Sequence, residues 1–315
     1  MNDRPLRIVI PGGSGQIGSL LARAFQRDSH DVSVLSRRPA PAPWRTVAWD
    51  GRTLAGWVSE LDGADVVINL AGRSVNCRYG TTNRHEMMES RIRSTQAIGH
   101  AIADCAHPPR TWLQASTATI YAHRFDAAND EVAGLIGGSE PDVPALWKFS
   151  VDIAQAWERT CVEADTPRTR KVLMRSAMTM SPDAGGPFAV LLRHARLGLG
   201  GRAASGRQFV SWIHHEDFVR AVSWLIAHDE VEGVVNLAAP APLPYTEFMR
   251  ELCDAAGIRV RLPTPAWLLE IGAVFLRTET ELLLKSRRVV PTRLLDLGFD
   301  FRFPRWREAV RDLLR

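Results

Sequence analysis

The chain has 315 residues, of which 45% are hydrophobic and 23% are charged. This composition excludes a disordered chain and predicts one α/β domain with an appended lobe. Lysines account for only three of the 39 basic residues, so the chain contains 36 arginines at a formal net charge of +4. Because these arginines form no run longer than two, we expect scattered surface charge and no nucleic-acid partner.

The cysteines and the apolar stretches limit the environment in which the protein works. Four cysteines are scattered along the chain without a Cys-x-x-Cys pair, which argues against a disulfide framework and a zinc site. The apolar stretch at 265–276 is interrupted by Glu270 and is far shorter than the roughly 20 residues of a membrane-spanning helix. The N-terminus carries no signal-peptide pattern. We therefore expect a cytoplasmic protein without a membrane partner.

Strand and helix patterns alternate through the first 180 residues. Apolar, β-branched runs predict strands at 6–10, 31–35, 46–49, 64–70, 111–116 and 171–175. Amphipathic periodicity predicts helices at 17–27, 85–103 and 148–164. This alternation predicts an α/β fold with a Rossmann-type, doubly wound parallel sheet. Between 122 and 144 the composition changes to Gly, Pro, Asp and Glu, which predicts a surface loop and a candidate lid.

The alternation weakens after residue 180. Short strands are predicted at 210–214 and 234–237, and helices at 216–227, 246–256, 266–275 and 305–314. We therefore divide the chain into two parts. The alternating α/β domain covers 1–180, and the chain re-enters it around 205–240. A smaller, mostly helical C-terminal lobe over 181–315 caps the substrate.

A glycine-rich turn separates the first predicted strand from the first helix. Its residues are Gly12, Gly13, Ser14, Gly15, Gln16, Ile17 and Gly18. They fit two registers of a dinucleotide fingerprint, Gly-x-Gly-x-x-Gly from Gly13 and Gly-x-x-Gly-x-x-Gly from Gly12. Glycines let the backbone turn tightly and approach a pyrophosphate, whose charge is bound by N–H groups at the start of the helix. Strand, turn and helix in this order predict a dinucleotide site.

The end of the second strand indicates which dinucleotide is bound. NAD sites usually place a carboxylate there for the ribose 2′-hydroxyl, whereas this chain has Ser36, Arg37 and Arg38. Two guanidinium groups suit a 2′-phosphate, so we predict NADP(H) in preference to NAD(H). Other strand ends supply the remaining predicted cofactor contacts, which are Asp50 for the adenine, Leu70, Ala71 and Gly72 for close backbone approach, and Ser116 and Arg175 on the nicotinamide side.

Together with motifs farther along, these residues resemble the extended short-chain dehydrogenase/reductase superfamily, and in particular its epimerase-like family with a C-terminal domain of unknown function. The shared marks run nearly end to end, at 12–18, 68–72, 90–91 with Thr95, 157–158, 206–214 with Asp217, 235–240, 288–291 and 297–301. The resemblance implies a Rossmann domain, a nicotinamide cofactor with Arg91 beside it, and a substrate cleft beneath the C-terminal lobe. Relatives often dimerise, so it also implies a homodimer.

The sequence departs from the superfamily at the catalytic residues. The superfamily's chemistry rests on Tyr-x-x-x-Lys, in which the lysine lowers the pKa of a tyrosine that exchanges a proton with substrate. No lysine stands four residues after any tyrosine of this chain, which are Tyr79, Tyr121 and Tyr245. Counted back from Trp157, the places of the pair fall at Ser150 and Ala154. Arg91 replaces the supporting Asn, and only the Ser/Thr place survives, as Thr117.

Two interpretations of this departure remain open. In the first, the protein is an epimerase-like, NADP(H)-dependent oxidoreductase of a small molecule, in which Thr117 binds a substrate oxygen and Tyr121 or Lys148 supplies the proton. In the second, it binds NADP(H) without turnover, as a sensor or scaffold. A nucleotide-sugar epimerase is a third candidate, because it shares the fold.

Residues after a Gly-rich loop at 198–206 are candidates for binding the substrate. Arg207, Gln208 and Trp212 mix hydrogen-bond donors with an aromatic ring, as expected of a pocket for an anionic or sugar-like molecule. His214 and His215 are adjacent on an extended segment and point to opposite faces, so we predict no metal site.

Overall fold

The computed structural model describes residues 4–141, 143–263 and 281–315. The helix predicted at 266–275 and the apolar stretch at 265–276 lie outside these residues. Among the helices that the structure describes, none is both long and apolar enough to cross a membrane.

Seven parallel strands form the central sheet, in the spatial order β10-β6-β5-β4-β1-β2-β3. They are β1 (Arg7–Pro11), β2 (Asp31–Ser36), β3 (Arg45–Ala48), β4 (Val66–Asn69), β5 (Thr111–Thr117), β6 (Arg170–Ser176) and β10 (Gly233–Leu237). The chain winds outward from β1 to β3 and then crosses back to β4 on the other side of β1. This is the predicted doubly wound α/β arrangement, and ligands bind such sheets beyond the carboxyl ends of the strands where the winding reverses.

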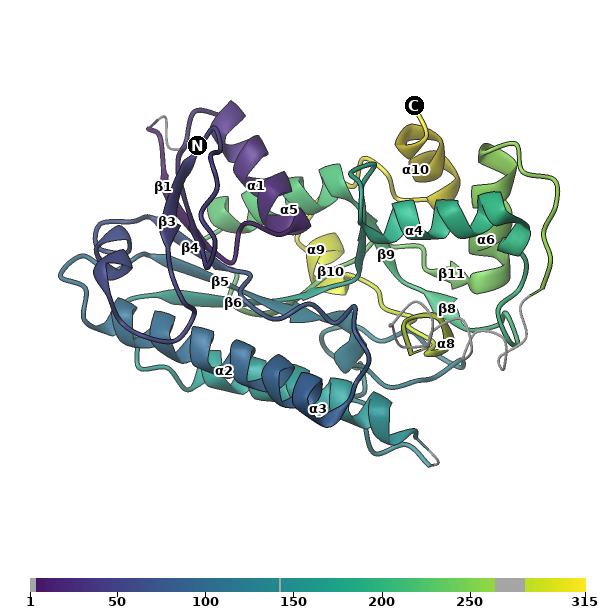
Figure 1. Ribbon diagram of the computed structural model, residues 1–315, viewed down its shortest axis with the longest axis horizontal. Helices are drawn as coiled ribbons and strands as arrows, with labels where there is room; N and C mark the ends of the chain where they lie inside the picture. Colours follow the sequence, from purple (N-terminus) through teal and green to yellow (C-terminus); the bar gives the residue numbers. More distant parts are fainter. Residues whose placement is uncertain (1–3, 142, 264–280) are drawn as a thin grey trace.

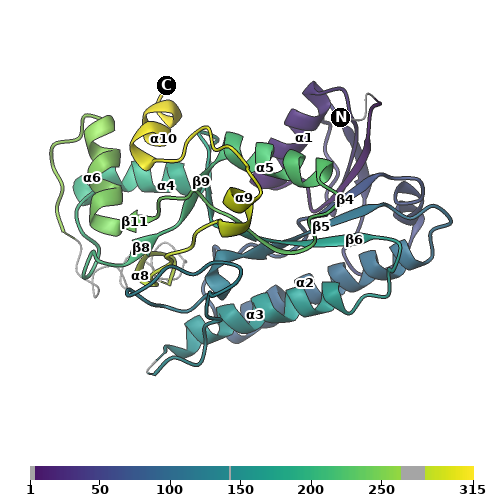
Figure 2. The same ribbon diagram turned by 180° about the vertical axis from the view of Figure 1, so that it is seen from behind.

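Helices cover both faces of the sheet (Figures 1 and 2). They are α2 (Thr81–Ala103) and α3 (Ala145–Val162) on one face, and α1 (Gln16–Arg27) and α5 (His215–Ala227) on the other. Strand β1 buries Ile8 and Ile10 in the cluster shared with α1 and α5, and buries Val9 in the cluster on the α2 side. Because both faces are buried there, the central strands β1 and β4 are nearly continuous apolar runs without polar alternation.

Two of these helices begin earlier than predicted. Helix α2 starts at Thr81 instead of residue 85, and α3 starts at Ala145 instead of residue 148. The residues before them, Gly80 and Pro144, have an extended backbone and end the preceding loops. The first turn of each helix is polar or irregular in its apolar spacing, so periodicity alone locates only the buried part of the helix.

The strand predicted at 210–214 is interrupted at Ser211. Two short pairs replace it, which are β8 (Phe209–Val210) with β11 (Leu243–Pro244), antiparallel, and β7 (Met178–Met180) with β9 (Trp212–His214), parallel. The Ser211 hydroxyl donates to the carbonyl oxygen of Arg287 (2.6 Å) and accepts from the N–H of Val289 (2.8 Å). A segment remote in sequence therefore binds at the break.

The described part of the C-terminal lobe has a core of its own. Its main helices are α4 (Pro187–His194), α6 (Tyr245–Ala255) and α10 (Trp306–Leu313). The Trp306 ring stacks on Phe248 with 4.1 Å between centroids and meets Trp212 edge-on at 5.0 Å. All three rings are buried, so aromatic packing stabilises this lobe.

After α8 (Glu281–Leu284) the chain returns to the central sheet. It forms α9 (Thr292–Asp296), which packs beside β10 (Figure 2). On the way it binds the loop predicted at 122–144. The buried Asn129 donates its N–H to the Arg288 carbonyl oxygen (2.7 Å) and accepts from the Val290 N–H (3.0 Å). The predicted surface loop is therefore fixed at its middle, while Val132 stays 84% exposed.

Candidate functional site

The glycine turn lies beyond the carboxyl end of β1 and is compatible with both possible registers. Gly12 has a φ of +76°, and a Cβ on it would lie 2.6 Å from the Cα of Ala71. A Cβ on Gly18 would lie 2.3 Å from the Cα of Gly13. Gly15 differs, because the nearest atom to its Cβ would be 4.0 Å away. Gly12 thus makes the turn, Gly18 permits close packing and Gly15 leaves open space, while a Cβ on Gly13 would lie 2.9 Å from Ile10, so both registers fit.

The open side of the turn fits a phosphate group. Ser14 and Gly15 are exposed, and α1 begins at the next residue, Gln16. The side-chain amide nitrogen of Gln16 is buried and makes no hydrogen bond among the described residues. Backbone N–H groups at a helix start provide donors that a pyrophosphate needs. The Gln16 amide packs against Gly186, so its contact with a nucleotide stays a prediction.

The end of β2 is bonded directly to this turn. The Gly12 N–H donates to the Leu35 carbonyl oxygen (2.9 Å), and the hydroxyl groups of Ser36 and Ser14 are 3.2 Å apart. The Ser36 hydroxyl also accepts from the N–H of Arg38 (3.2 Å). Arg37 and Arg38 are both exposed beside the turn. Two exposed cations therefore stand where an NAD site has its carboxylate.

Asp50, predicted to contact the adenine, binds its own loop after β3. One carboxylate oxygen accepts from the N–H groups of Arg52 (2.8 Å) and Thr53 (2.9 Å), and the other accepts from the Thr53 hydroxyl (2.8 Å). Burial favours a higher pKa for Asp50, but these hydrogen bonds outweigh it and lower the pKa. The carboxylate thus stays ionised and shapes the loop.

The loop after β4 is held by Arg91 from α2. A Cβ on Gly72 would lie 3.2 Å from the Cγ and Cζ atoms of Arg91, so the side chain packs closely against this glycine. The buried guanidinium group donates to the carbonyl oxygens of Met87 (3.0 Å) and Arg73 (3.1 Å), and lies 4.8 Å from the ring of Trp157. Burial lowers the pKa of Arg91 to about 10. Arg91 therefore fixes the backbone that follows Leu70 and Ala71.

Three predicted site residues meet in one buried network between β5, β6 and β10. Arg175 donates twice to the Glu158 carboxylate (2.8 and 2.7 Å), which also accepts from the Ser116 hydroxyl (2.5 Å). The Arg175 guanidinium group lies 5.0 Å from the ring of Tyr121, whose hydroxyl donates to Asn236 (2.9 Å). Burial raises the pKa of Tyr121. All three residues thus have protein partners, and their contact with a ligand stays a prediction.

Thr117 and Lys148 lie in different surroundings. Thr117 ends β5 at the carboxyl edge, and its half-exposed hydroxyl accepts from the N–H of Thr119 (3.1 Å). The Lys148 side chain is 55% exposed and pairs with Asp152 one turn along α3 (2.9 Å). Thr117 is therefore placed to meet a ligand at the sheet edge, whereas Lys148 is a surface residue.

Comparison with known proteins agrees with this geometry. Residues 8–136 match the NAD dependent epimerase/dehydratase family, and residues 264–313 match a domain of unknown function, DUF1731. The human epimerase family protein SDR39U1 is 30% identical over 98% of this chain and 100% of its own length. An epimerase family protein of Staphylococcus epidermidis is 30% identical over 98% of this chain and 99% of its own length.

The chain belongs to the epimerase family.

Solved structures of this family have the same fold. The crystal structure of human SDR39U1 (isoform 2) with NADPH has a TM-score of 0.84 at 29% identity, over 98% of this chain and 99% of that one. A nucleoside-diphosphate sugar epimerase from Corynebacterium glutamicum has a TM-score of 0.77 at 25% identity, over 99% of this chain and 58% of that one. The Rossmann-type sheet and the resemblance predicted from the sequence are thus confirmed.

The residues predicted to bind substrate do not line one open surface of this epimerase family protein. Trp212 is fully buried in the core of the C-terminal lobe, and Gln208 is 3% exposed, with its side-chain amide donating to the Ala203 carbonyl oxygen (3.0 Å). Only Arg207 is exposed. Their role in binding substrate stays a prediction. No group of three or more His, Cys, Asp or Glu side chains that could hold a metal occurs within residues 4–141, 143–263 and 281–315.

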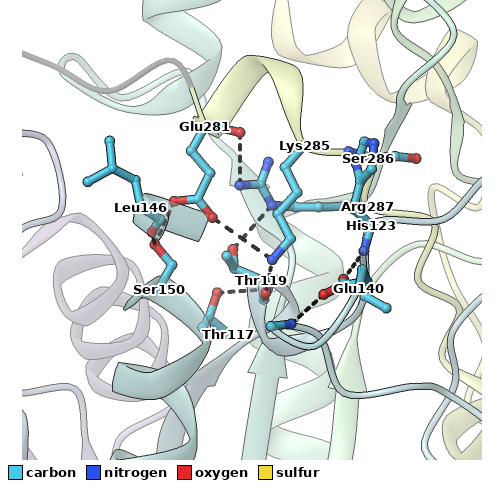
Figure 3. Close-up of polar contacts among 12 residues, drawn as sticks. Thr117, Thr119, His123, Glu140, Leu146, Ser150, Glu281, Lys285, Ser286 and Arg287 are labelled. Carbon is cyan, nitrogen blue, oxygen red and sulfur yellow. Dashed lines mark hydrogen bonds and ion pairs between the residues drawn. The ribbon is translucent and has the colours of Figure 1, made fainter. Parts of the chain in front are cut away.

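Sequence reasoning missed a polar cluster at the place of the absent Tyr-x-x-x-Lys pair (Figure 3). Ser150 stands at the expected place of the tyrosine, and its hydroxyl donates to the Glu281 carboxylate (2.5 Å). The Lys285 amine donates to the Thr119 carbonyl oxygen (2.8 Å), and Arg287 donates to the Thr119 hydroxyl (3.2 Å). The sequence did offer one indication of this cluster. Lysine is rare in this chain, and Lys285 is one of only three, so it could have been considered as a candidate site residue.

Proposed function

We propose that this epimerase family protein binds NADP(H) at the carboxyl edge of its sheet and acts as an oxidoreductase of the epimerase type. Its substrate would be a small molecule with a hydroxyl or carbonyl group. The single observation that carries the proposal is the pair Arg37 and Arg38 beside a glycine turn whose open residue is Gly15. The human relative crystallised with NADPH supports the same choice of nucleotide.

Each part of the proposed site has a task in this mechanism. The start of α1 and Gln16 would hold the pyrophosphate, and Arg37 and Arg38 would hold the 2′-phosphate. A bound nicotinamide supplies or accepts a hydride. Thr117 would bind a substrate oxygen, because its hydroxyl accepts from the Thr119 N–H and its own proton can be donated. We assign nucleotide binding to residues 1–180 and coverage of the substrate to 181–315.

Calorimetric titration with NADPH and NADH tests this proposal. We expect micromolar or tighter binding of NADPH and weaker binding of NADH. The variant Arg37→Ala/Arg38→Ala should bind NADPH at least roughly 10- to 100-fold more weakly, which is the loss expected for one charge-assisted hydrogen bond of about 1.5–3 kcal/mol. Its affinity for NADH should stay the same, since NADH has no 2′-phosphate.

A matched control separates local contact from net charge. Arg27→Ala/Arg315→Ala removes two exposed cations that lie away from the turn and should leave both affinities unchanged. Equal affinities of the wild type for NADPH and NADH would contradict the 2′-phosphate assignment. Absence of binding for both would contradict the proposed function. Binding of NADPH without turnover of any carbonyl compound would favour a sensor.

A further inference from the structure

Lys285 is buried just beyond the carboxyl end of β5, at the sheet edge to which we assign the nicotinamide half of the dinucleotide. It follows α8 and is 2% exposed. Its amine donates to the carbonyl oxygen of Thr119, just beyond the end of β5, although the two residues are 166 positions apart in the chain. In Figure 3 the amine points toward the segment that joins Thr117 to Thr119.

Among the described residues, one carboxylate lies at ion-pair distance from this amine, and it belongs to Glu281 (Figure 3). The nearest described carboxylate oxygen belongs to Glu281 and is 3.9 Å from Nζ, longer than the 2.7–2.9 Å typical of a charge-assisted hydrogen bond. The Glu281 carboxylate accepts from Ser150 on α3. From the loop on the other side, the Glu140 carboxylate accepts from the backbone N–H groups of His123 (2.8 Å) and Gly138 (2.5 Å). Both Glu140 oxygens and one Glu281 oxygen thus accept from other donors, and the second Glu281 oxygen is the one nearest to the Lys285 amine.

Like charge and burial act on the amine together. Burial first and then the guanidinium group of Arg287 lower the pKa of Lys285 to about 8, and the Glu281 and Glu140 carboxylates only partly oppose this. A pKa near the working pH is what proton exchange requires. Tyr79 behaves in the opposite way, since burial and Glu281 raise its pKa to about 12. Of these two groups beside Glu281, Lys285 is the better proton donor and acceptor.

The position of this group matches the gap in the family pattern. The places of the tyrosine and lysine on α3 are taken by Ser150 and by Ala154, which is fully buried. Ser150 is bonded to Glu281, one turn of α8 before Lys285. The C-terminal segment thus places a lysine amine close to α3, the helix on which the lysine of the Tyr-x-x-x-Lys pair is missing.

We propose that Lys285 is the proton-exchanging residue of this site and acts on a carbonyl or hydroxyl oxygen held at Thr117. This proposal rests on the proposed NADP(H) function. In reduction, the substrate carbonyl carbon gains a hydride from the dinucleotide, and the carbonyl oxygen gains a proton from the Lys285 ammonium group. The products are an alcohol, the oxidised dinucleotide and a neutral amine, which recovers its proton from water. Oxidation of an alcohol runs through the same steps in reverse.

The scarcity of lysine makes a direct test possible. In protein labelled with [6-13C]lysine, three side-chain signals are expected, from Lys148, Lys171 and Lys285. The variants Lys148→Arg and Lys171→Arg each remove one signal, so the third is assigned without altering Lys285. The three signals are titrated with pH in the full-length protein, alone and with saturating NADPH or NADP+.

The two redox states of the nucleotide test whether Lys285 lies beside the nicotinamide ring, as proton exchange there requires. The nicotinamide ring is positively charged in NADP+ and neutral in NADPH, so an amine beside it should titrate about one pH unit lower with NADP+. Lys148 and Lys171 should respond equally to both forms, because Lys148 is exposed on α3 and Lys171 binds carbonyl oxygens at the C-terminal end of that helix. Equal titration of Lys285 with both forms would overturn the proposal.

Failure of the inference and failure of the proposed function are separable. If calorimetry shows NADPH binding while the Lys285 signal titrates at the same pH with NADPH and NADP+, only the inference fails. If neither nucleotide binds, the proposed function fails as well. For each carbonyl compound that the wild type reduces, Lys285→Met should lower kcat about 100-fold with unchanged NADPH affinity, and Lys148→Met should change neither. Equal kcat values for the wild type and Lys285→Met would also overturn the proposal.

Discussion

The two ends of the proposed site are built in different ways. At the glycine turn, the residues that would hold the phosphates lie between Gly12 and Arg38 and bond to one another over short sequence distances. At the other end, the Lys285 amine bonds to Thr119 across 166 positions of the chain. The first end is a local motif that a sequence pattern can record. The second is assembled only when the C-terminal segment crosses the sheet, so no short pattern records it.

The largest expected change in stability comes from the buried pair of Arg175 and Glu158 at the nicotinamide end of the proposed site. Arg175→Met leaves the Glu158 carboxylate buried without its cation and should lower the free energy of unfolding by about 3–5 kcal/mol. Its NADPH affinity should stay within a factor of about two, because Arg175 already has protein partners. Urea unfolding and calorimetry measure the two quantities.

Two controls accompany that variant. Arg175→Met/Glu158→Leu should recover part of the lost stability, since no uncompensated charge remains. Arg23→Met breaks an exposed pair with Asp183 and should change stability by no more than about 1 kcal/mol. A large loss of NADPH affinity in the double variant would show that Arg175 contacts the nucleotide after all.

Two substitutions in the glycine turn should distinguish an effect on folding from an effect on NADPH binding. Gly18→Ala places a Cβ against the backbone of Gly13 and should cost about 1–3 kcal/mol of stability, with loss of NADPH binding. Gly15→Ala meets open space in the protein and should fold normally, yet bind NADPH at least 10-fold more weakly because its methyl group occupies the phosphate position. Normal binding by a stable Gly15→Ala variant would contradict the location of the pyrophosphate.

Tyr121 tests whether the nicotinamide end depends on the buried network. Tyr121→Phe removes the hydroxyl that donates to Asn236 and should cost about 1–3 kcal/mol, because the Asn236 oxygen loses a buried donor. NADPH affinity and the Lys285 titration should not change. A shift of the Lys285 signal in this variant would instead link Tyr121 to proton exchange.

The smallest expected effect is a pH dependence of stability. It comes from His214, which lies outside both ends of the proposed site. Burial first, then His215 and Arg302, lower the pKa of His214 from 6.5 to about 3, although the Asp312 carboxylate is 3.4 Å from its Nε2 atom. Between these pH values the unfolded chain binds a proton that the folded protein does not, so stability falls as the pH falls below 6.5. At pH 5.5 the loss from His214 should be about 1 kcal/mol.

His214→Asn isolates this contribution, because asparagine can still accept from the Glu216 N–H at the start of α5. Thermal unfolding of the wild type and the variant between pH 7.5 and 5.0 should diverge as the pH falls, with the wild type losing more stability. Parallel curves would show that His214 does not stay neutral in the folded state.

Sequence patterns predicted what local periodicity and short motifs encode. The order of strands and helices, the dinucleotide-type turn and the absence of Tyr-x-x-x-Lys could all be derived from the chain. The break at Ser211 could not, because it depends on bonds to Arg287 and Val289. The burial of Trp212 could not either, since its partner Trp306 lies far along the chain. Long-range contacts decided each of these cases.

The most direct test of the two-ended site is a crystal structure of the protein with NADP+. We expect the pyrophosphate at the start of α1, the 2′-phosphate within hydrogen-bond distance of Arg37 or Arg38, and the nicotinamide ring between Thr117 and Lys285. A dinucleotide whose 2′-phosphate faces solvent, or whose nicotinamide ring lies away from Thr117, would contradict this arrangement.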